Sequence, residues 1–216
     1  MRIRPSAIVF DYGNVLSAPQ GSREIAEMAS LFQTAVDVFQ QAYWTFRLDY
    51  DAAAFDPASY WNLVARSLSR SVSEAQIEEL VEADSRSWAY PAAVLPEWAR
   101  NVRKAGFKTG LLSNMPTPVR EHVAKCEWLP QFDHRTFSCD VRSAKPAPEI
   151  FRHCLKGLDV EPAEVLFLDD KLENVRAAET LGIQGVVYTT VERAAQEIGR
   201  RFDIPMPPVD TLEYGK

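Results

Sequence analysis

The chain has 216 residues, of which 46% are apolar and 25% are charged. This length suits one domain, or one domain with a modest insertion, and the apolar content is sufficient for a hydrophobic core. The formal net charge of −6 argues against nucleic acid or an anionic membrane as the main partner, because phosphate groups attract basic surfaces. The first apolar run ends at Asp11 and is too short for the apolar region of a signal peptide, and no apolar stretch approaches the length of a membrane span, so we expect a cytoplasmic protein.

The three cysteines are an odd number and show neither a CxxC pair nor the spacing of a zinc site. We therefore predict reduced thiols rather than disulfides or metal ligands. These residues are Cys126, Cys139 and Cys154.

Residues 7–18, AIVFDYGNVLSA, combine a short apolar run with an abrupt change to Asp11. The run is typical of a parallel strand that is buried on both faces, and Gly13 and Asn14 tolerate the tight backbone that follows such a strand. Ligands of open α/β sheets bind at that edge, so Asp11 is a candidate functional carboxylate. The alternative is that Asp11 only caps a turn.

Three later segments also place polar side chains at the end of a predicted strand or just before a predicted helix. LLSNMP at 111–116 ends a second apolar strand with Ser113 and Asn114. SAKPAPEIF at 143–151 places Lys145 before a helix that Pro148 would start well. VLFLDDKLENV at 165–175 ends a third strand with the acid pair Asp169 and Asp170.

Residues 17–93 show helical rather than strand-like spacing, with helices predicted near 22–32, 35–47, 57–68 and 73–87. Asp56 before Pro57, and Ser73 with Gln76, are start signals for the last two helices. We expect the aromatic side chains of this segment to fill the interior of a helical bundle: Phe39, Tyr43, Trp44, Phe46, Tyr60 and Trp61.

The rest of the chain alternates between predicted helices and strands, which indicates right-handed crossovers and a parallel sheet covered by helices on both faces. Helices are expected at 93–105, 117–126, 148–157, 171–181 and 191–200, and strands at 107–113, 134–138, 165–169 and 185–189. Residues 202–216 include three prolines and are expected to form an extended tail.

Taken in order, the acid, the hydroxyl and amide, the lysine and the acid pair resemble the four motifs of the haloacid dehalogenase (HAD) superfamily. The resemblance spans residues 7–190 apart from the segment between the first two motifs, and it includes a DxGNV first motif. It implies an α/β fold with a HAD-like Rossmannoid parallel sheet in the order 3-2-1-4-5. It also implies a catalytic core of residues 1–16 and 94–216 and a four-helix C1 cap domain of residues 17–93.

The resemblance further implies a hydrolase that uses Mg²⁺. Asp11, Asp170 and the backbone carbonyl of Gly13 would provide oxygen ligands, because a cation must relieve the repulsion between a carboxylate and a phosphate. Asp169 is either a further ligand or an acid behind the ligands, and the amide of Asn174 could orient ligands or waters.

Lys145 would neutralise the phosphate and the nucleophile, while Ser113 and Asn114 would bind phosphate oxygens. The expected activity is a Mg²⁺-dependent phosphatase that hydrolyses a small phosphorylated metabolite, such as a sugar phosphate, through an aspartyl phosphate on Asp11. Each residue also has a structural interpretation: Lys145 as a surface lysine, Ser113 as a helix cap, and the acid pair as a charged helix start.

Gly13 departs from the usual family pattern, which has a second aspartate two residues after the nucleophile. That acid protonates the leaving oxygen, a role typically worth about 10² to 10⁴-fold in rate. A slow enzyme, or a substitute acid from the cap, is therefore expected. The segment 46–56 is the candidate loop facing the substrate, and Arg47, Tyr50 and Asp51 are its candidate specificity residues; a solvated helix end is the alternative.

Two rival functions remain open at this stage. A 2-haloacid dehalogenase would use the same aspartate without a metal, but the acid pair would then repel a carboxylate substrate. A catalytically weak or inactive HAD-fold binding protein is suggested by Gly13 alone. The sequence leaves a monomer and a homodimer equally possible.

Overall fold

The computed structural model describes residues 2–208 and contains the five-stranded, all-parallel sheet that the sequence predicts. Its order is β3-β2-β1-β4-β5, which confirms the predicted order 3-2-1-4-5. The central strand, β1, therefore brings Asp11 to the middle of the carboxyl edge. The strands are β1 (Ala7–Phe10), β2 (Lys108–Ser113), β3 (His134–Phe137), β4 (Val165–Asp169) and β5 (Gln184–Val187).

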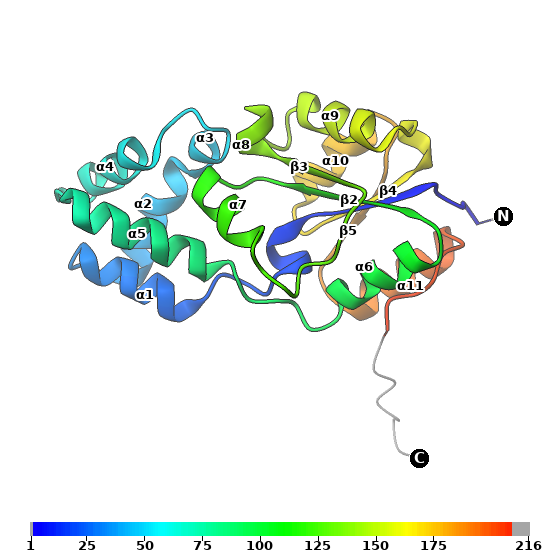
Figure 1. Ribbon diagram of the computed structural model, residues 1–216, viewed down its shortest axis with the longest axis horizontal. Coiled ribbons are helices and arrows are strands. Elements are labelled where there is room, and N and C mark those ends of the chain that lie inside the picture. The colour runs from blue at the N-terminus through cyan, green and yellow to red at the C-terminus, as the bar shows by residue number, and fades with distance from the viewer. Residues whose placement is uncertain (1, 209–216) are drawn as a thin grey trace, which may run out of the picture.

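Two separate layers of helices cover the two faces of the sheet (Figure 1). Alternate side chains of the strands pack against these two layers. Ile8 and Phe10 of β1 pack with α6 (Leu95–Lys104) and α11 (Val191–Arg201). Ala7 and Val9 face the opposite layer, which contains α9 (Pro148–Leu158) and α10 (Leu172–Thr180). Every residue of β1 is buried, which agrees with the continuous apolar run that is typical of a strand in a parallel sheet.

A group of helices, here called the helical insertion, lies between β1 and β2 in the chain and beside the sheet in Figure 1. Asp56 and the Ser73–Gln76 capping box start two of its helices as predicted. The insertion has its own hydrophobic cluster, separate from the two clusters of the sheet. Its helices are α1 (Ser22–Leu31), α2 (Val36–Thr45), α3 (Arg47–Asp51), α4 (Pro57–Ser67) and α5 (Glu74–Ser87).

Two predictions about this insertion were wrong. The segment 46–56 is not a loop throughout, because its first part forms the short helix α3. Trp44 does not fill the bundle interior: 45% of its surface is exposed, whereas Tyr43 and Trp61 are buried as expected. Trp44 follows Tyr43 on the same helix and therefore points in a different direction, toward the sheet.

The two connections between the insertion and the sheet run side by side. The Ala18 N–H donates to the Tyr90 carbonyl at 2.9 Å, and the Ala92 N–H donates to the Leu16 carbonyl at 2.9 Å. These bonds fix where the insertion begins and ends relative to β1. Two further short helices, α7 (Thr117–Val123) and α8 (Ser138–Val141), follow β2 and β3.

The predicted tail is anchored in the part that the structure describes. Phe202 is buried, and the Trp98 indole donates to the Pro205 carbonyl at 2.8 Å. Residues 209–216 of the predicted tail lie outside the described residues. Within residues 2–208 no helix is long and apolar enough to cross a membrane, and the three cysteines are free as predicted.

Candidate active site

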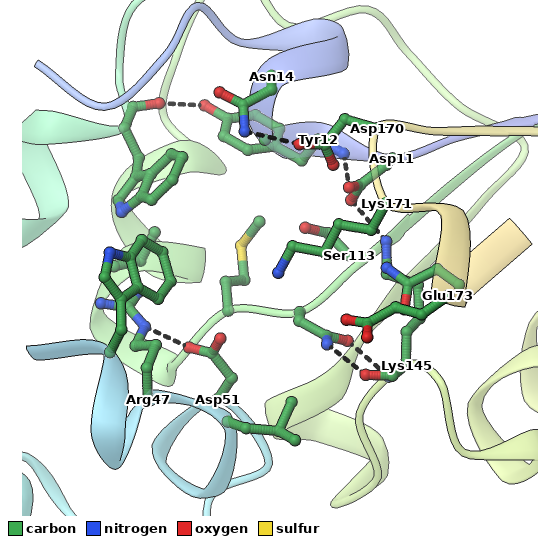
Figure 2. Close-up of a pocket in the computed structure, with 18 residues that line it drawn as sticks. Asp11, Tyr12, Asn14, Arg47, Asp51, Ser113, Lys145, Asp170, Lys171 and Glu173 are labelled. Atoms are coloured by element: carbon green, nitrogen blue, oxygen red, sulfur yellow. Dashed lines mark hydrogen bonds and ion pairs between the residues drawn. The ribbon is translucent and has the colours of Figure 1, made fainter. Parts of the chain in front are cut away.

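The four sequence segments meet at one cavity of about 240 Å³ between the carboxyl edge of the sheet and the helical insertion (Figure 2). Asp11 follows β1, Ser113 ends β2, and Asp170 follows β4. Lys145 precedes α9 and lines the same cavity. Side chains that are more than 150 positions apart in the chain therefore share one site.

Asp11 has one occupied and one open carboxylate oxygen. Its Oδ1 accepts the Tyr12 N–H at 2.7 Å and lies 2.7 Å from Lys145 Nζ. No donor from residues 2–208 reaches Oδ2, although this residue lines the cavity. Burial raises the pKa of Asp11 to about 7, opposed by Lys145 and reinforced by Asp169. The arrangement leaves one oxygen oriented and available for a cation or for attack.

Lys145 is buried and all three of its ammonium protons have acceptors. Besides Asp11, its Nζ donates to Asp169 Oδ2 at 2.6 Å and to the Leu112 carbonyl at 3.0 Å. Burial lowers the pKa of Lys145, but the two carboxylates outweigh that effect and raise it above its usual value. Lys145 is thus a fixed cation rather than a surface lysine.

Asp169 is fully buried, and both of its carboxylate oxygens accept hydrogen bonds. Besides Lys145, the Lys171 N–H donates to Oδ1 at 2.8 Å, and Asn174 Nδ2 lies 3.0 Å from Oδ1 and 3.1 Å from Oδ2. These contacts favour the second of the two roles that the sequence left open, an acid that orients Lys145 from behind the ligands.

Asp170 is held by Asn14, whose Nδ2 donates to Asp170 Oδ2 at 2.9 Å. Asn14 has a φ of 58°, the left-handed conformation that Asn tolerates, so the turn after β1 aims this amide at β4. Sequence reasoning identified the turn but missed the contact. Burial raises the pKa of Asp170.

The three carboxylates could hold a metal ion. Asp11, Asp169 and Asp170 each offer an oxygen, and these oxygens lie within 4.8 Å of one another. Asn174 Oδ1 is buried without a hydrogen-bond partner among residues 2–208, and such an oxygen could accept from a metal-bound water. Gly13 also lines the cavity, and the metal-binding role of its carbonyl stays a prediction.

Ser113 and Asn114 both line the cavity, but they differ in what they bind. The amide side chain of Asn114 brackets the backbone of Lys145: Oδ1 accepts its N–H at 2.8 Å and Nδ2 donates to its carbonyl at 2.9 Å. Asn114 therefore positions Lys145 in this structure. The Ser113 hydroxyl remains available for a phosphate oxygen.

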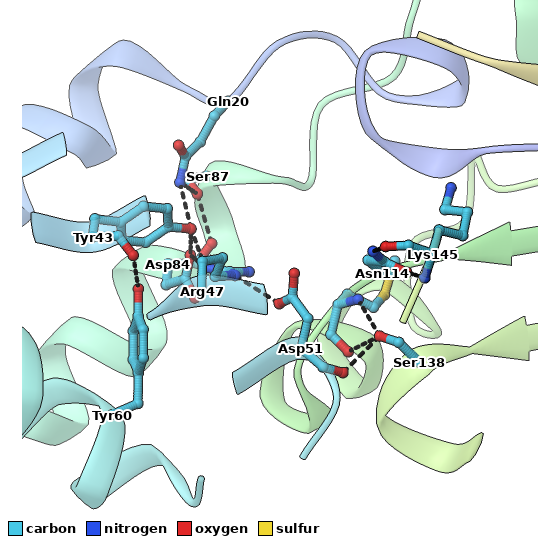
Figure 3. Close-up of polar contacts among 11 residues, drawn as sticks. Gln20, Tyr43, Arg47, Asp51, Tyr60, Asp84, Ser87, Asn114, Ser138 and Lys145 are labelled. Carbon is cyan, nitrogen blue, oxygen red and sulfur yellow. Dashed lines mark hydrogen bonds and ion pairs between the residues drawn. The ribbon is translucent and has the colours of Figure 1, made fainter. Parts of the chain in front are cut away.

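The helical insertion contributes Arg47 and Asp51 to the cavity, whereas Tyr50 lies inside the insertion, stacked 4.1 Å from Tyr60. Arg47 is buried, with Nε 2.7 Å from Asp51 Oδ1 and Nη1 3.0 Å from Asp84 Oδ2. Figure 3 shows how this network extends through Tyr43 to Gln20 and Ser87. Burial lowers the pKa of Arg47, but Asp51 and Asp84 more than compensate, so it stays charged.

The space beside Gly13 is occupied by an aromatic ring. A Cβ at this position would lie 3.3 Å from Trp88 Cζ3, and its three nearest atoms all belong to Trp88. Gly13 has a φ of −64°, which any residue can adopt, so the ring and not the backbone restricts this position. No periodicity in the sequence indicates a contact between residues so far apart.

Several other cavity residues were missed from the sequence. Trp44 and Leu48 expose 45% and 53% of their surfaces at the mouth, and the Lys171 ammonium lies 5.9 Å from the Trp44 ring centre. Glu173 lines the same side as Asp170. The helical pattern contained no signal that would separate these residues from ordinary surface residues.

Comparison with known families agrees with this geometry. Residues 5–182 match the family described as haloacid dehalogenase-like hydrolase. The chain belongs to this family of hydrolases.

Curated relatives match parts of the chain. A mouse acyl-CoA dehydrogenase family member 10 is 32% identical over 118 residues, or 52% of this chain. A sesquiterpene phosphatase from Aspergillus oryzae is 34% identical over 46% of this chain, and a phosphorylated carbohydrates phosphatase from Thermotoga maritima is 35% identical over 34% of it. The matches cover 11%, 51% and 37% of these three relatives.

Solved structures share the fold over most of their length. A HAD family enzyme from Bacteroides thetaiotaomicron, in complex with magnesium and inorganic phosphate, is 21% identical with a TM-score of 0.63, covering 86% of this chain and 94% of that one. An L-2-haloacid dehalogenase from Xanthobacter autotrophicus with covalently bound chloropropionic acid is 20% identical with a TM-score of 0.64, covering 91% and 83%.

Proposed function

We propose that this protein is a Mg²⁺-dependent phosphatase of small phosphorylated metabolites. The observation that supports it best is the convergence of Asp11, Lys145, Asp169 and Asp170 on one cavity. A carboxylate with one open oxygen, a buried ammonium and a potential cation site together satisfy what phosphoryl transfer needs. The phosphatases among the relatives and the magnesium and phosphate bound by a structural neighbour support the same activity.

Asp11 Oδ2 would attack phosphorus and form an aspartyl phosphate, which water then hydrolyses. Lys145 would face the oxygens on which negative charge is spread, with the Ser113 hydroxyl as a further donor. Asp11 and Asp170 would hold Mg²⁺, which when bound reduces the repulsion between the carboxylate and the phosphate. Asp169 and Asn114 would keep Lys145 in place through the contacts described above.

A panel of phosphate monoesters, including sugar phosphates and prenyl phosphates, tests the proposal. Phosphate release should require Mg²⁺ and should stop when EDTA is added. Absence of turnover over the whole panel by folded protein with Mg²⁺ would contradict the proposal and favour a binding protein.

Dehalogenation is the second candidate, because the chain lacks a carboxylate at Gly13 and shares the fold of a haloacid dehalogenase. The acid pair opposes it, since the carboxylates near Asp11 would repel a haloacid anion. Chloride release from 2-chloropropionate in the presence of EDTA would favour dehalogenation over phosphate hydrolysis.

A further inference from the structure

The proposed phosphatase needs a group that protonates the leaving oxygen, and residue 13 cannot provide it. Gly13 has no side chain, and Trp88 occupies the adjacent space. In phosphoryl transfer the attacking and leaving oxygens lie roughly in line with phosphorus between them. The missing group must therefore face Asp11 from across the cavity, on the side of the helical insertion.

Few titratable groups on the described lining of the cavity are free for this role. Lys145 is bonded to two carboxylates and a carbonyl, and Asp170 belongs to the potential metal site. Lys171 and Glu173 are exposed and belong to the sheet side, next to Asp170. Among the lining residues within 2–208, Asp51 is the carboxyl that comes from the insertion.

Asp51 is held from both sides of the cavity. Arg47 Nε donates to its Oδ1 at 2.7 Å, and Arg47 is fixed in turn by Asp84. The backbone carbonyl of Asp51 accepts the Ser138 hydroxyl of α8 at 2.6 Å (Figure 3). No donor in the described part of the chain reaches Asp51 Oδ2, and Figure 2 shows this carboxyl on the opposite side of the cavity from Asp11.

The surroundings of Asp51 also suit proton exchange near neutral pH. Burial raises the pKa of Asp51 to about 6, although Arg47 and the more distant Lys171 lower it; Asp84 adds to the increase. Both protonation states are then accessible at the pH of the cell. An efficient general acid and base needs a pKa in this range.

We propose that Asp51 takes the catalytic place of the aspartate that is absent at residue 13; this inference rests on the proposed phosphatase activity. As Asp11 Oδ2 bonds to phosphorus, the bond from phosphorus to the ester oxygen breaks, and the Asp51 carboxyl gives its proton to that oxygen. The Asp51 carboxylate then takes a proton from water while the water oxygen bonds to phosphorus. The bond from phosphorus to Asp11 breaks, which releases inorganic phosphate and restores both carboxyl groups.

Two esters with different leaving groups test this role in Asp51→Asn. An alkyl phosphate needs a proton on its departing oxygen, whereas p-nitrophenolate leaves readily as an anion. We expect kcat/KM for the alkyl phosphate to fall about 10² to 10⁴-fold, and that for p-nitrophenyl phosphate to fall less than about tenfold. The second ester also shows that the variant folds and binds phosphate. Asp49→Asn, which removes an exposed carboxylate from the same helix, should leave both values unchanged.

Equal losses with the two esters, or no loss with either, would overturn the role of Asp51. So would a larger selective loss in Glu173→Gln than in Asp51→Asn. A selective loss that Asp51→Glu partly restores would support the role, because the longer acid keeps the exchangeable proton. Failure of the wild-type protein to hydrolyse any ester of the panel described above would instead reject the underlying phosphatase proposal.

Discussion

Single residues in this site are restricted by neighbours that are distant in sequence. Gly13 is a clear case, because its backbone conformation suits any residue while the Trp88 ring restricts its side chain. The turn after β1 is therefore adapted to a tryptophan contributed by the far end of the helical insertion. The Trp88 ring lies beside the point where a side chain at residue 13 would begin, so the glycine at this position and the tryptophan are structurally linked.

We predict that Gly13→Ala and Trp88→Leu are coupled in stability. With Trp88 present, the added methyl group requires the ring to move by a few tenths of an ångström, and we expect this tighter packing to lower the stability. In the Trp88→Leu background, the effect of Gly13→Ala on the free energy of unfolding should be more favourable by about 1 kcal/mol. Urea unfolding of the four proteins measures this difference. Identical effects of Gly13→Ala in both backgrounds would show that the ring does not restrict this position.

Asp170 provides a second test at the level of one residue. Its carboxylate lies in the acid cluster and is oriented by Asn14, so Asp170→Asn should weaken Mg²⁺ binding. We expect the Mg²⁺ concentration for half-maximal activity to rise at least about tenfold. Asp37→Asn, which changes an exposed acid on α2, is the matched control for the loss of one negative charge. An unchanged Mg²⁺ requirement in Asp170→Asn would remove this residue from the set of ligands.

At the level of whole elements, the position of α3 depends on its contact with α8. The Ser138 hydroxyl donates to the Asp51 carbonyl at 2.6 Å and accepts the buried Met115 N–H at 2.9 Å. One side chain thus links the helical insertion, α8 and the residue that follows Asn114. This link sets the distance between the insertion and the carboxyl edge of the sheet.

Ser138→Ala should therefore destabilise the protein although it removes only one oxygen. The buried Met115 N–H would lose its acceptor, which costs about 1 to 3 kcal/mol in the free energy of unfolding. The exposed Ser30→Ala serves as a control, with an expected change within about 0.5 kcal/mol. Guanidinium unfolding compares the two. Equal stability of Ser138→Ala and Ser30→Ala would mean that the link between α3 and α8 contributes nothing measurable.

How well an element could be predicted depended on how local its signal is. The four long helices of the insertion have regular apolar spacing, and the starts at Asp56 and Ser73 have side chains that cap their own helix. Helix α3 spans only Arg47–Asp51, too short for a helical period to appear in the sequence. Its role at the cavity became visible only through contacts with Asp84 and Ser138.

The same distinction applies to the site. Asp11, Ser113, Lys145 and Asp170 follow or precede regular elements, so the sequence could identify them as candidates. The side-chain amide of Asn114 bonds to the backbone of Lys145, a contact that the sequence did not indicate, and the phosphate-binding role of Asn114 stays a prediction. The partners of Asn14 and Trp88 could not be predicted. Each contact joins segments that are far apart in the sequence, and no local pattern indicates that they meet in the folded chain.

For the molecule as a whole, the two apolar clusters of the sheet and the one of the insertion lie around one charged site in the described residues. The sheet and the insertion each bury their own apolar clusters, and the acids of the site lie where they meet. The division into a core of residues 1–16 and 94–216 and a cap of residues 17–93 stays a proposal. It agrees with the paired connections at Ala18 and Ala92.

The activity of an Asp11→Asn variant tests most directly the proposal that Asp11 is the nucleophile. The amide of Asn has nearly the same shape as the carboxylate, but it cannot attack phosphorus in its place. With any phosphate ester that the wild-type protein hydrolyses in Mg²⁺, kcat should fall by about 10³-fold or more. The circular dichroism spectrum should match that of the wild-type protein. Hydrolysis by a folded Asp11→Asn variant within tenfold of the wild-type rate would contradict the account.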